Sequence, residues 1–153
     1  MRVRYLTTTP RQTQKLGEIL AKEVLKTKFK KGALTLGLEG DLGGGKTTFL
    51  QGFAKGLGIK EKILSPTFII LKKFKIQDSN FKNFYHVDCY RIEKPREILS
   101  LGFKEIVSNP ENIITIEWAG RIRNILPKIF ITLKFLFIDK TTRKITIKIS
   151  PKL

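Results

Sequence analysis

The sequence contains only one cysteine, Cys89, and one histidine, His86, among its 153 residues. A single cysteine cannot form an internal disulfide, and one Cys with one His cannot supply the ligands of a structural zinc site. Residues 1–5 lack the apolar core of a signal peptide, and the most apolar late stretch, residues 129–138, is too short to span a bilayer. We therefore expect a cytoplasmic protein with no membrane association.

Acidic residues are also scarce, since 13 Asp and Glu stand against 30 Lys and Arg, which gives a net charge of +17 at pH 7. Such an excess is typical of a nucleic-acid-binding face. It also fits a general abundance of Lys, Ile, Phe and Asn, as in proteins encoded by AT-rich genomes. The lysines are scattered along the chain and form no charged tail. The charge alone therefore leaves contact with RNA undecided.

Hydrophobic residues make up 41% of the sequence and recur at regular spacing along it. We therefore expect one folded domain over residues 1–153. Helical spacing predicts helices over residues 10–25, 48–57 and 95–101, the first with Thr9 as N-cap and Pro10 at its first position. The expected strands are residues 2–7, 33–38, 68–76, 84–90, 112–117, 129–137 and 144–149. This order predicts an α/β fold with a mixed, mainly parallel central sheet flanked by helices and a C-terminal β-hairpin.

A glycine-rich loop with the GxxxxGKT spacing of a Walker A motif joins the second strand to the second helix. It consists of Gly40, Asp41, Leu42, Gly43, Gly44, Gly45, Lys46 and Thr47, and Thr48 follows it. Glycines let consecutive backbone N–H groups point at an anion, and the helix N-terminus adds partial positive charge. Lys46 can reach the terminal phosphates of ATP, and the Thr47 hydroxyl can bind Mg²⁺. The motif predicts a single-domain P-loop NTPase that binds ATP or ADP with magnesium.

Two acidic residues end apolar strands: Asp88 follows residues 84–87, and Glu117 follows residues 113–116. An acid at this position is typical of a Walker B element, which binds the magnesium ion or orients the attacking water. We expect at least one of the two to meet the metal, and the spacing does not decide which has which role. His86 alternates with Asp88 on its strand and is interpreted as a packed histidine.

Two more segments are candidate parts of the site. Ser65 and Thr67 follow the loop and its helix, where many P-loop proteins place a switch that senses the terminal phosphate or the metal. A simple turn before a strand explains the same residues equally well. Trp118, beside Glu117, can line the nucleotide pocket, although a lone tryptophan is more often part of a core.

Other classes of P-loop protein fit less well. A GTPase carries an NKxD-type guanine-reading motif, which residues 138–141 do not match, and the chain is too short for an ABC or AAA+ ATPase. A small-molecule kinase needs an arginine-rich lid, whereas the chain after Glu117 holds Arg121 and Arg123 and then alternating strands. A kinase of a nucleoside or sugar stays open as an alternative. So does a basic RNA-binding module with a vestigial nucleotide site.

Five motifs occur in order along the chain. They are GDLGGGKTTF at residues 40–49, SPTF at 65–68, HVDCYR at 86–91, LGF at 101–103 and IEW at 116–118. Together they resemble the TsaE (YjeE) family of bacterial tRNA threonylcarbamoyladenosine biosynthesis proteins, over about residues 13–127. Gly44 stands where the family usually has Ala, and Cys89 where an aliphatic residue is common. Neither side chain is expected to take part in chemistry.

The resemblance implies a weak ATPase that acts with TsaB and TsaD in forming threonylcarbamoyladenosine next to the anticodon of tRNA. It implies that the chain does not itself transfer the threonylcarbamoyl group. Whether its basic surface contacts tRNA, even weakly or inside a complex, stays open.

The resemblance also implies roles for individual residues. Lys46 and Thr47 would hold the phosphates and magnesium, and Thr67 would belong to a switch. Asp88 is preferred for orienting water and Glu117 for the metal, although the two could be exchanged. Two further residues are expected near the nucleotide, and these are Trp118 and Thr13.

Overall fold

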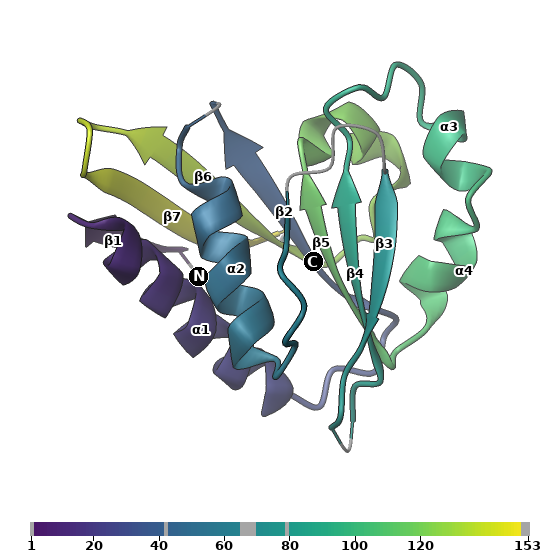
Figure 1. The fold of residues 1–153 in the computed structure, drawn as a ribbon. Helices are drawn as coiled ribbons and strands as arrows, with labels where there is room; N and C mark the ends of the chain where they lie inside the picture. The colour runs from purple at the N-terminus through teal and green to yellow at the C-terminus, as the bar shows by residue number, and fades with distance from the viewer. Residues whose placement is uncertain (1, 42, 65–69, 79, 151–153) are drawn as a thin grey trace.

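The computed structural model describes residues 2–41, 43–64, 70–78 and 80–150 (Figure 1). The strands form a seven-stranded sheet in the order β1-β7-β6-β2-β5-β4-β3. They are β1 (Arg2–Thr7), β2 (Leu34–Gly40), β3 (Leu71–Lys75), β4 (Asn83–Asp88), β5 (Asn112–Glu117), β6 (Phe130–Phe137) and β7 (Arg143–Ser150). The helices are α1 (Pro10–Leu25), α2 (Lys46–Gly56), α3 (Arg96–Leu99), α4 (Phe103–Ser108) and the 3₁₀ helix η1 (Ala119–Ile125).

The sheet is parallel at its centre and antiparallel at its edges. Strands β6, β2, β5 and β4 run parallel, whereas β1 and β6 pair antiparallel with β7, and β3 pairs antiparallel with β4. This confirms the predicted α/β fold with its mixed sheet and C-terminal hairpin. The carboxyl ends of parallel strands meet at one edge of a sheet, which is where α/β proteins bind their ligands.

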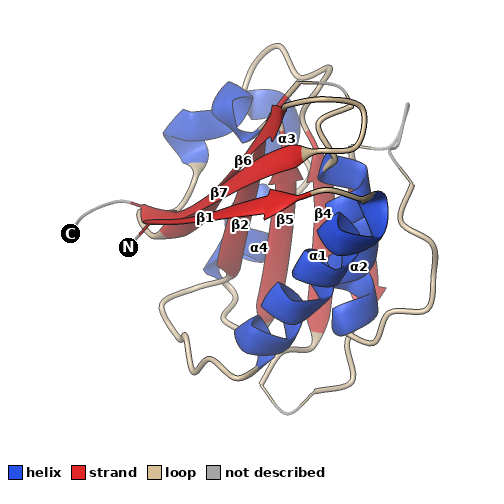
Figure 2. Cartoon of the chain, turned by 90° about the vertical axis from the view of Figure 1, so that its left-hand side faces the viewer, coloured by secondary structure: helices blue, strands red, loops and turns tan. Residues whose placement is uncertain are grey.

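Helices α1 and α2 pack against each other and cover one face of the sheet (Figures 1 and 2). Glycine allows this close crossing, because a Cβ on Gly52 would lie 1.8 Å from the carbonyl oxygen of Gln14, and one on Gly17 would lie 2.2 Å from that of Phe49. The predicted N-cap is confirmed, since the Thr9 hydroxyl accepts a hydrogen bond from the backbone N–H of Gln12 at 3.1 Å. This packing fixes the start of α2 relative to the start of α1.

Two apolar cores lie on the two faces of the sheet. Phe49, Phe53 and Phe84 belong to the core beneath α1 and α2. Ile98 of α3 and Phe103 of α4 belong to the other core, together with residues of η1. None of the helices in the described part of the chain combines the length and apolar character needed to cross a membrane.

The structure differs from the sequence-based expectation in several element bounds and in the 3₁₀ helix η1, which was not expected. The strand expected over residues 84–90 ends at Asp88, whose carboxylate accepts a hydrogen bond from the Tyr90 N–H at 2.9 Å and so turns the chain. The short helix expected over residues 95–101 is present as α3 but is confined to Arg96–Leu99, and Gly102 with its φ of 81° closes the turn that follows; the helix α4 that begins at Phe103 was not expected. The expected strand over residues 68–76 begins outside the described residues, and β3 starts at Leu71.

Candidate functional site

The glycine-rich loop runs from the carboxyl end of β2 into the first turn of α2. Gly40 has a φ of 140°, and a Cβ there would lie 2.4 Å from the Phe135 carbonyl oxygen of β6, so only glycine fits. Gly45 is the N-cap of α2 with a φ of 98°. Because glycine offers no side chain to cap the helix, the first N–H groups of α2 can donate to an anion instead. The exposed Asp41 and Gly43 stand at the rim of the loop, and Leu42 lies outside the described residues.

Lys46 is buried between the loop and the ends of the strands. Its Nζ donates a hydrogen bond to the Gly40 carbonyl oxygen and lies 4.1 Å from the centroid of the Trp118 ring. Burial lowers the pKa of Lys46, and the negative charges of Glu117 and Asp88 act in the opposite direction. The ammonium group therefore lies within electrostatic reach of both carboxylates at the start of α2. Thr47 and Thr48 follow it in the first turn of α2 and are half-buried.

Asp88 and Glu117 are neighbours at the carboxyl edge of the sheet, because they are direct partners in the parallel pairing of β4 with β5. Glu117 Oε2 lies 2.9 Å from His86 Nε2, and both side chains are buried. Burial raises the pKa of Asp88, the hydrogen bond from the Tyr90 N–H lowers it, and the charge of Glu117 raises it further. Two neighbouring carboxylates repel each other when both are charged, and a cation bound between them would offset this repulsion.

The oxygen donors at this edge suit magnesium, which prefers one or two carboxylates together with phosphates and water. Among the hydrogen bonds of the described residues, none uses Asp88 Oδ2 or Glu117 Oε1. The described residues include no cluster of three or more His, Cys, Asp or Glu that could enclose a metal ion on its own. The donor set therefore fits a magnesium ion that shares its ligands with a nucleotide, with Thr47 as the hydroxyl donor.

Thr13 and Trp118 approach the loop from two other elements. Thr13 lies in the first turn of α1, and a Cβ on Gly45 would lie 3.6 Å from its methyl group. Its hydroxyl oxygen is 2.7 Å from that of Thr7 at the end of β1. Trp118 follows β5 with a φ of 59°, and its backbone N–H donates to the Leu38 carbonyl oxygen at 3.1 Å. This turn directs the indole ring toward Lys46.

Sequence reasoning missed a contact between the loop and the last strand. The guanidinium of Arg143 donates from Nε to the Gly43 carbonyl oxygen at 3.2 Å. The same group donates to the carbonyl oxygens of Asp139 and Thr142 and lies 4.5 Å from the centroid of the Phe137 ring. Arg143 therefore connects the glycine-rich loop to the β6–β7 hairpin.

His86 was interpreted only as a packed histidine, and its bond to Glu117 was not foreseen. The alternation of His86 with Asp88 was the available signal, since residues two apart on a strand point to the same face. The predicted switch residues, Ser65 and Thr67, lie outside the described residues.

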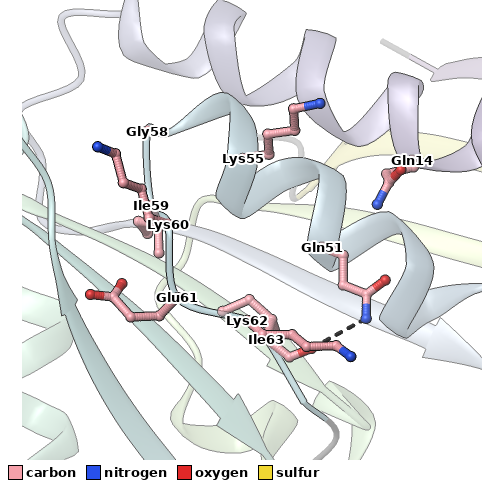
Figure 3. Close-up of a pocket in the computed structure, with 9 residues that line it drawn as sticks. All are labelled: Gln14, Gln51, Lys55, Gly58, Ile59, Lys60, Glu61, Lys62 and Ile63. Carbon is pink, nitrogen blue, oxygen red and sulfur yellow. Dashed lines mark hydrogen bonds between the residues drawn. The ribbon is translucent and has the colours of Figure 1, made fainter.

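A separate pocket of about 620 Å³ lies beside α1, α2 and the segment that follows α2 (Figure 3). Its lining residues are Gln14, Gln51, Lys55, Gly58, Ile59, Lys60, Glu61, Lys62 and Ile63. The Gln51 side-chain amide donates to the Ile63 carbonyl oxygen at 3.4 Å along one wall. None of the residues predicted for the nucleotide site lines this pocket, so it is distinct from the glycine-rich loop.

Comparison with known proteins gives consistent matches. The family model of the threonylcarbamoyl adenosine biosynthesis protein TsaE matches residues 7–145. The tRNA threonylcarbamoyladenosine biosynthesis protein TsaE of Bacillus subtilis is 37% identical over 126 residues, which are 82% of this chain and 72% of that protein. The protein of the same name from Rickettsia typhi is 41% identical over 112 residues, 72% of this chain and 74% of that one. The crystal structure of Bacillus subtilis YdiB is similar with a TM-score of 0.72 and 31% identity, over 96% of this chain and 84% of that chain.

Proposed function

The chain belongs to the TsaE family of tRNA threonylcarbamoyladenosine biosynthesis proteins, and on this premise we propose that it is a magnesium-dependent ATPase whose turnover requires protein partners. The partners that the family implies are TsaB and TsaD, and the threonylcarbamoyl transfer itself takes place elsewhere in their complex. The observation that carries the proposal is the convergence of Lys46, Asp88 and Glu117 beside the N-terminus of α2. The family match also favours this function over the nucleoside or sugar kinase that a P-loop alone leaves open.

In this proposal the loop binds the phosphates and the strand ends serve the reaction. The backbone N–H groups of residues 45–47 at the N-terminus of α2 donate to the phosphate oxygens, and Lys46 moves from the Gly40 carbonyl to neutralise the terminal phosphate. Magnesium, when bound, neutralises charge on the β- and γ-phosphates. Phosphoryl transfer leaves little covalent work for the protein, so positioning and electrostatics supply the rate.

The contacts of the two carboxylates support different roles for them. His86 holds one oxygen of Glu117 in a fixed orientation, as an outer-shell partner does for a metal ligand, so we assign Glu117 together with Thr47 to the magnesium ion. The Oδ1 atom of Asp88 accepts a hydrogen bond from the Tyr90 N–H, and its Oδ2 atom has no hydrogen-bond partner among the described residues. We therefore assign Asp88 to orienting the attacking water. Arg143 acts as a positioning residue, because it reaches the loop through a backbone carbonyl.

The test measures the rate of magnesium-dependent ATP hydrolysis by the full chain, with and without the purified TsaB–TsaD pair. We expect the pair to stimulate hydrolysis, and Asp88→Ala to lower the stimulated rate by about 10²-fold or more while ATP binding persists. The matched control is Glu61→Ala, which removes an exposed carboxylate away from the loop and should leave the rate unchanged. If the TsaB–TsaD pair neither binds the chain nor stimulates its ATP hydrolysis, the proposed partner-dependent function is wrong.

A further inference from the structure

The outer side of strands β1, β7 and β6 carries a concentration of basic residues. Its cations are Arg2, Arg4, Lys134, Lys144 and Lys148, which we call the basic sheet face. None of these three strands contains an Asp or Glu. None of these side chains belongs to the proposed nucleotide site.

The strand register places these side chains on one side of the sheet. Residues directly opposite one another on paired strands point to the same face. Thr146 of β7 lies between Arg4 and Lys134, and Lys148 lies between Arg2 and Thr132. A third row is formed by Leu6, Lys144 and Leu136. The three rows together make a continuous surface across three strands.

Burial confirms that this side faces solvent. Arg2, Arg4, Lys134 and Lys148 are exposed. The residues that alternate with them point to the opposite side, where Leu133 and Ile145 are fully buried in the core beneath α1 and α2. These two helices cover that side of the sheet in Figure 2.

The positive charges of this face are not neutralised by the protein. Among the described residues, none of its five cations forms a salt bridge. The one acid in register with the face is Glu39 of β2, the direct partner of Lys134, and its carboxylate is paired with Arg123 at 3.1 Å. The concentrated charge is therefore available to a negatively charged partner from outside.

We propose that the basic sheet face binds the sugar–phosphate backbone of RNA, an activity beyond the proposed ATP hydrolysis. Outward residues along one strand are about 6.6–6.8 Å apart, and adjacent strands are about 4.8 Å apart. The cations are thus spread over a surface instead of converging on a point, which suits a chain of phosphates and not a small anion. The Thr132 and Thr146 hydroxyls lie between them as further donors to phosphate oxygens.

An acidic protein surface is the competing partner, and the composition of the face argues against it. The cores of protein interfaces are depleted of charged residues, lysine among them. Here lysine or arginine occurs in all three rows, and Leu6 and Leu136 are the large apolar residues of the face. Phosphate contacts, by contrast, are made mainly by Lys, Arg and hydroxyl side chains.

The test measures binding of an unmodified, fluorescently labelled tRNA transcript to the full chain, by anisotropy at several salt concentrations. The variant Arg4→Gln/Lys134→Gln/Lys148→Gln changes three exposed cations of the face. We expect its affinity for tRNA to fall at least about tenfold at 0.1 M salt. The negative slope of the logarithm of the association constant against the logarithm of the salt concentration should become shallower by about 2 to 3. Magnesium-ATP binding by the same variant should stay at the wild-type value, which separates this proposal from the nucleotide site.

The matched control is Lys55→Gln/Lys60→Gln/Lys62→Gln, which changes three cations that line the separate pocket. Each triple variant removes three positive charges, so both lower the net charge from +17 to +14. We expect the control to bind tRNA like the wild type. Equal losses in the two variants would mean that net charge alone drives binding and would overturn the proposal.

A second readout uses the unaltered protein. Lysine acetylation followed by mass spectrometry should show tRNA protecting Lys134, Lys144 and Lys148, while Lys55 and Lys60 stay reactive. The proposal is also overturned if the face variant binds tRNA normally but loses the TsaB–TsaD pair, because the face would then be a protein interface.

Discussion

The ammonium group of Lys46 lies 4.1 Å from the centroid of the Trp118 ring while it donates a hydrogen bond to the Gly40 carbonyl oxygen. A phosphate attracts an ammonium group more strongly than an indole ring or a neutral carbonyl does. Nucleotide binding should therefore draw Lys46 away from the ring. Because the sequence has one tryptophan, tryptophan fluorescence reports the surroundings of Trp118, which are Lys46, Tyr90 and Arg121.

We predict that magnesium-ATP changes the intrinsic fluorescence of Trp118 in a saturable titration. Lys46→Ala should shift the spectrum of the free protein and remove most of the response to ATP, because the cation beside the ring is gone. Lys55→Ala, which removes an exposed lysine later on the same helix, should titrate like the wild type. An unchanged titration for Lys46→Ala would show that Lys46 does not move on binding.

Replacement of Asp88 should raise stability while it lowers hydrolysis. Burial holds the pKa of Asp88 above its ordinary value in the folded protein. As pH rises, the unfolded chain therefore loses this proton first, and the wild type loses stability between the ordinary pKa and the folded pKa. Asp88→Asn keeps an acceptor for the Tyr90 N–H and has no such penalty. Urea denaturation should find the variant more stable than the wild type at pH 7, with the difference shrinking toward pH 4.

Asp139→Asn supplies a control of opposite sign. Hydrogen bonds from the Thr141 and Thr142 backbone N–H groups lower the pKa of Asp139. A lowered pKa contributes stability above the ordinary pKa that is lost as pH falls through the folded value. This variant should be less stable than the wild type at pH 7. If Asp88→Asn behaved in the same way, Asp88 would be a structural carboxylate.

Loss of the Arg143 side chain should weaken nucleotide binding without unfolding the protein. Its guanidinium fixes the Gly43 carbonyl, and a hydrogen bond from a charged donor contributes about 1.5–3 kcal/mol, less where it is exposed to solvent. We expect Arg143→Gln to raise the Kd for magnesium-ATP by about three- to tenfold, measured by calorimetry. Arg96→Gln, an exposed change on α3, should have no effect. A wild-type Kd for Arg143→Gln would contradict the positioning role.

The glycine contact between α1 and α2 predicts a stability effect away from the site. A Cβ on Gly52 would collide with the Gln14 carbonyl oxygen, so Gly52→Ala must push the helices apart at a cost of about 1–3 kcal/mol or more. Gly120→Ala is the matched control, because a Cβ there would meet nothing within 4 Å. Urea denaturation of both variants checks the prediction, which fails if they are equally stable.

The loop and the strand ends could be predicted because their signals are local. An apolar strand, the GxxxxGKT spacing and an amphipathic helix occupy one continuous stretch, and Asp88 and Glu117 each end an apolar run. Parallel pairing then brings the two acids together, as the α/β pattern implies.

The remaining contacts could not be predicted, because they join residues that are distant in sequence. His86 meets Glu117 across 31 positions, and Arg143 meets Gly43 across 100. The basic sheet face was hidden in the same way: its lysines and arginines look scattered along the chain, and only the order β1-β7-β6 gathers them. The scattered charge did not predict a patch, although the alternation within each strand was visible.

The most direct test of the account is a crystal structure with magnesium and a non-hydrolysable ATP analogue. We predict that the triphosphate lies against the N–H groups between Gly43 and Thr47, with Lys46 on the terminal phosphate. Asp88 and Glu117 should both face the metal or the water in line with that phosphate. A triphosphate bound elsewhere, or both carboxylates turned away from it, would contradict the account.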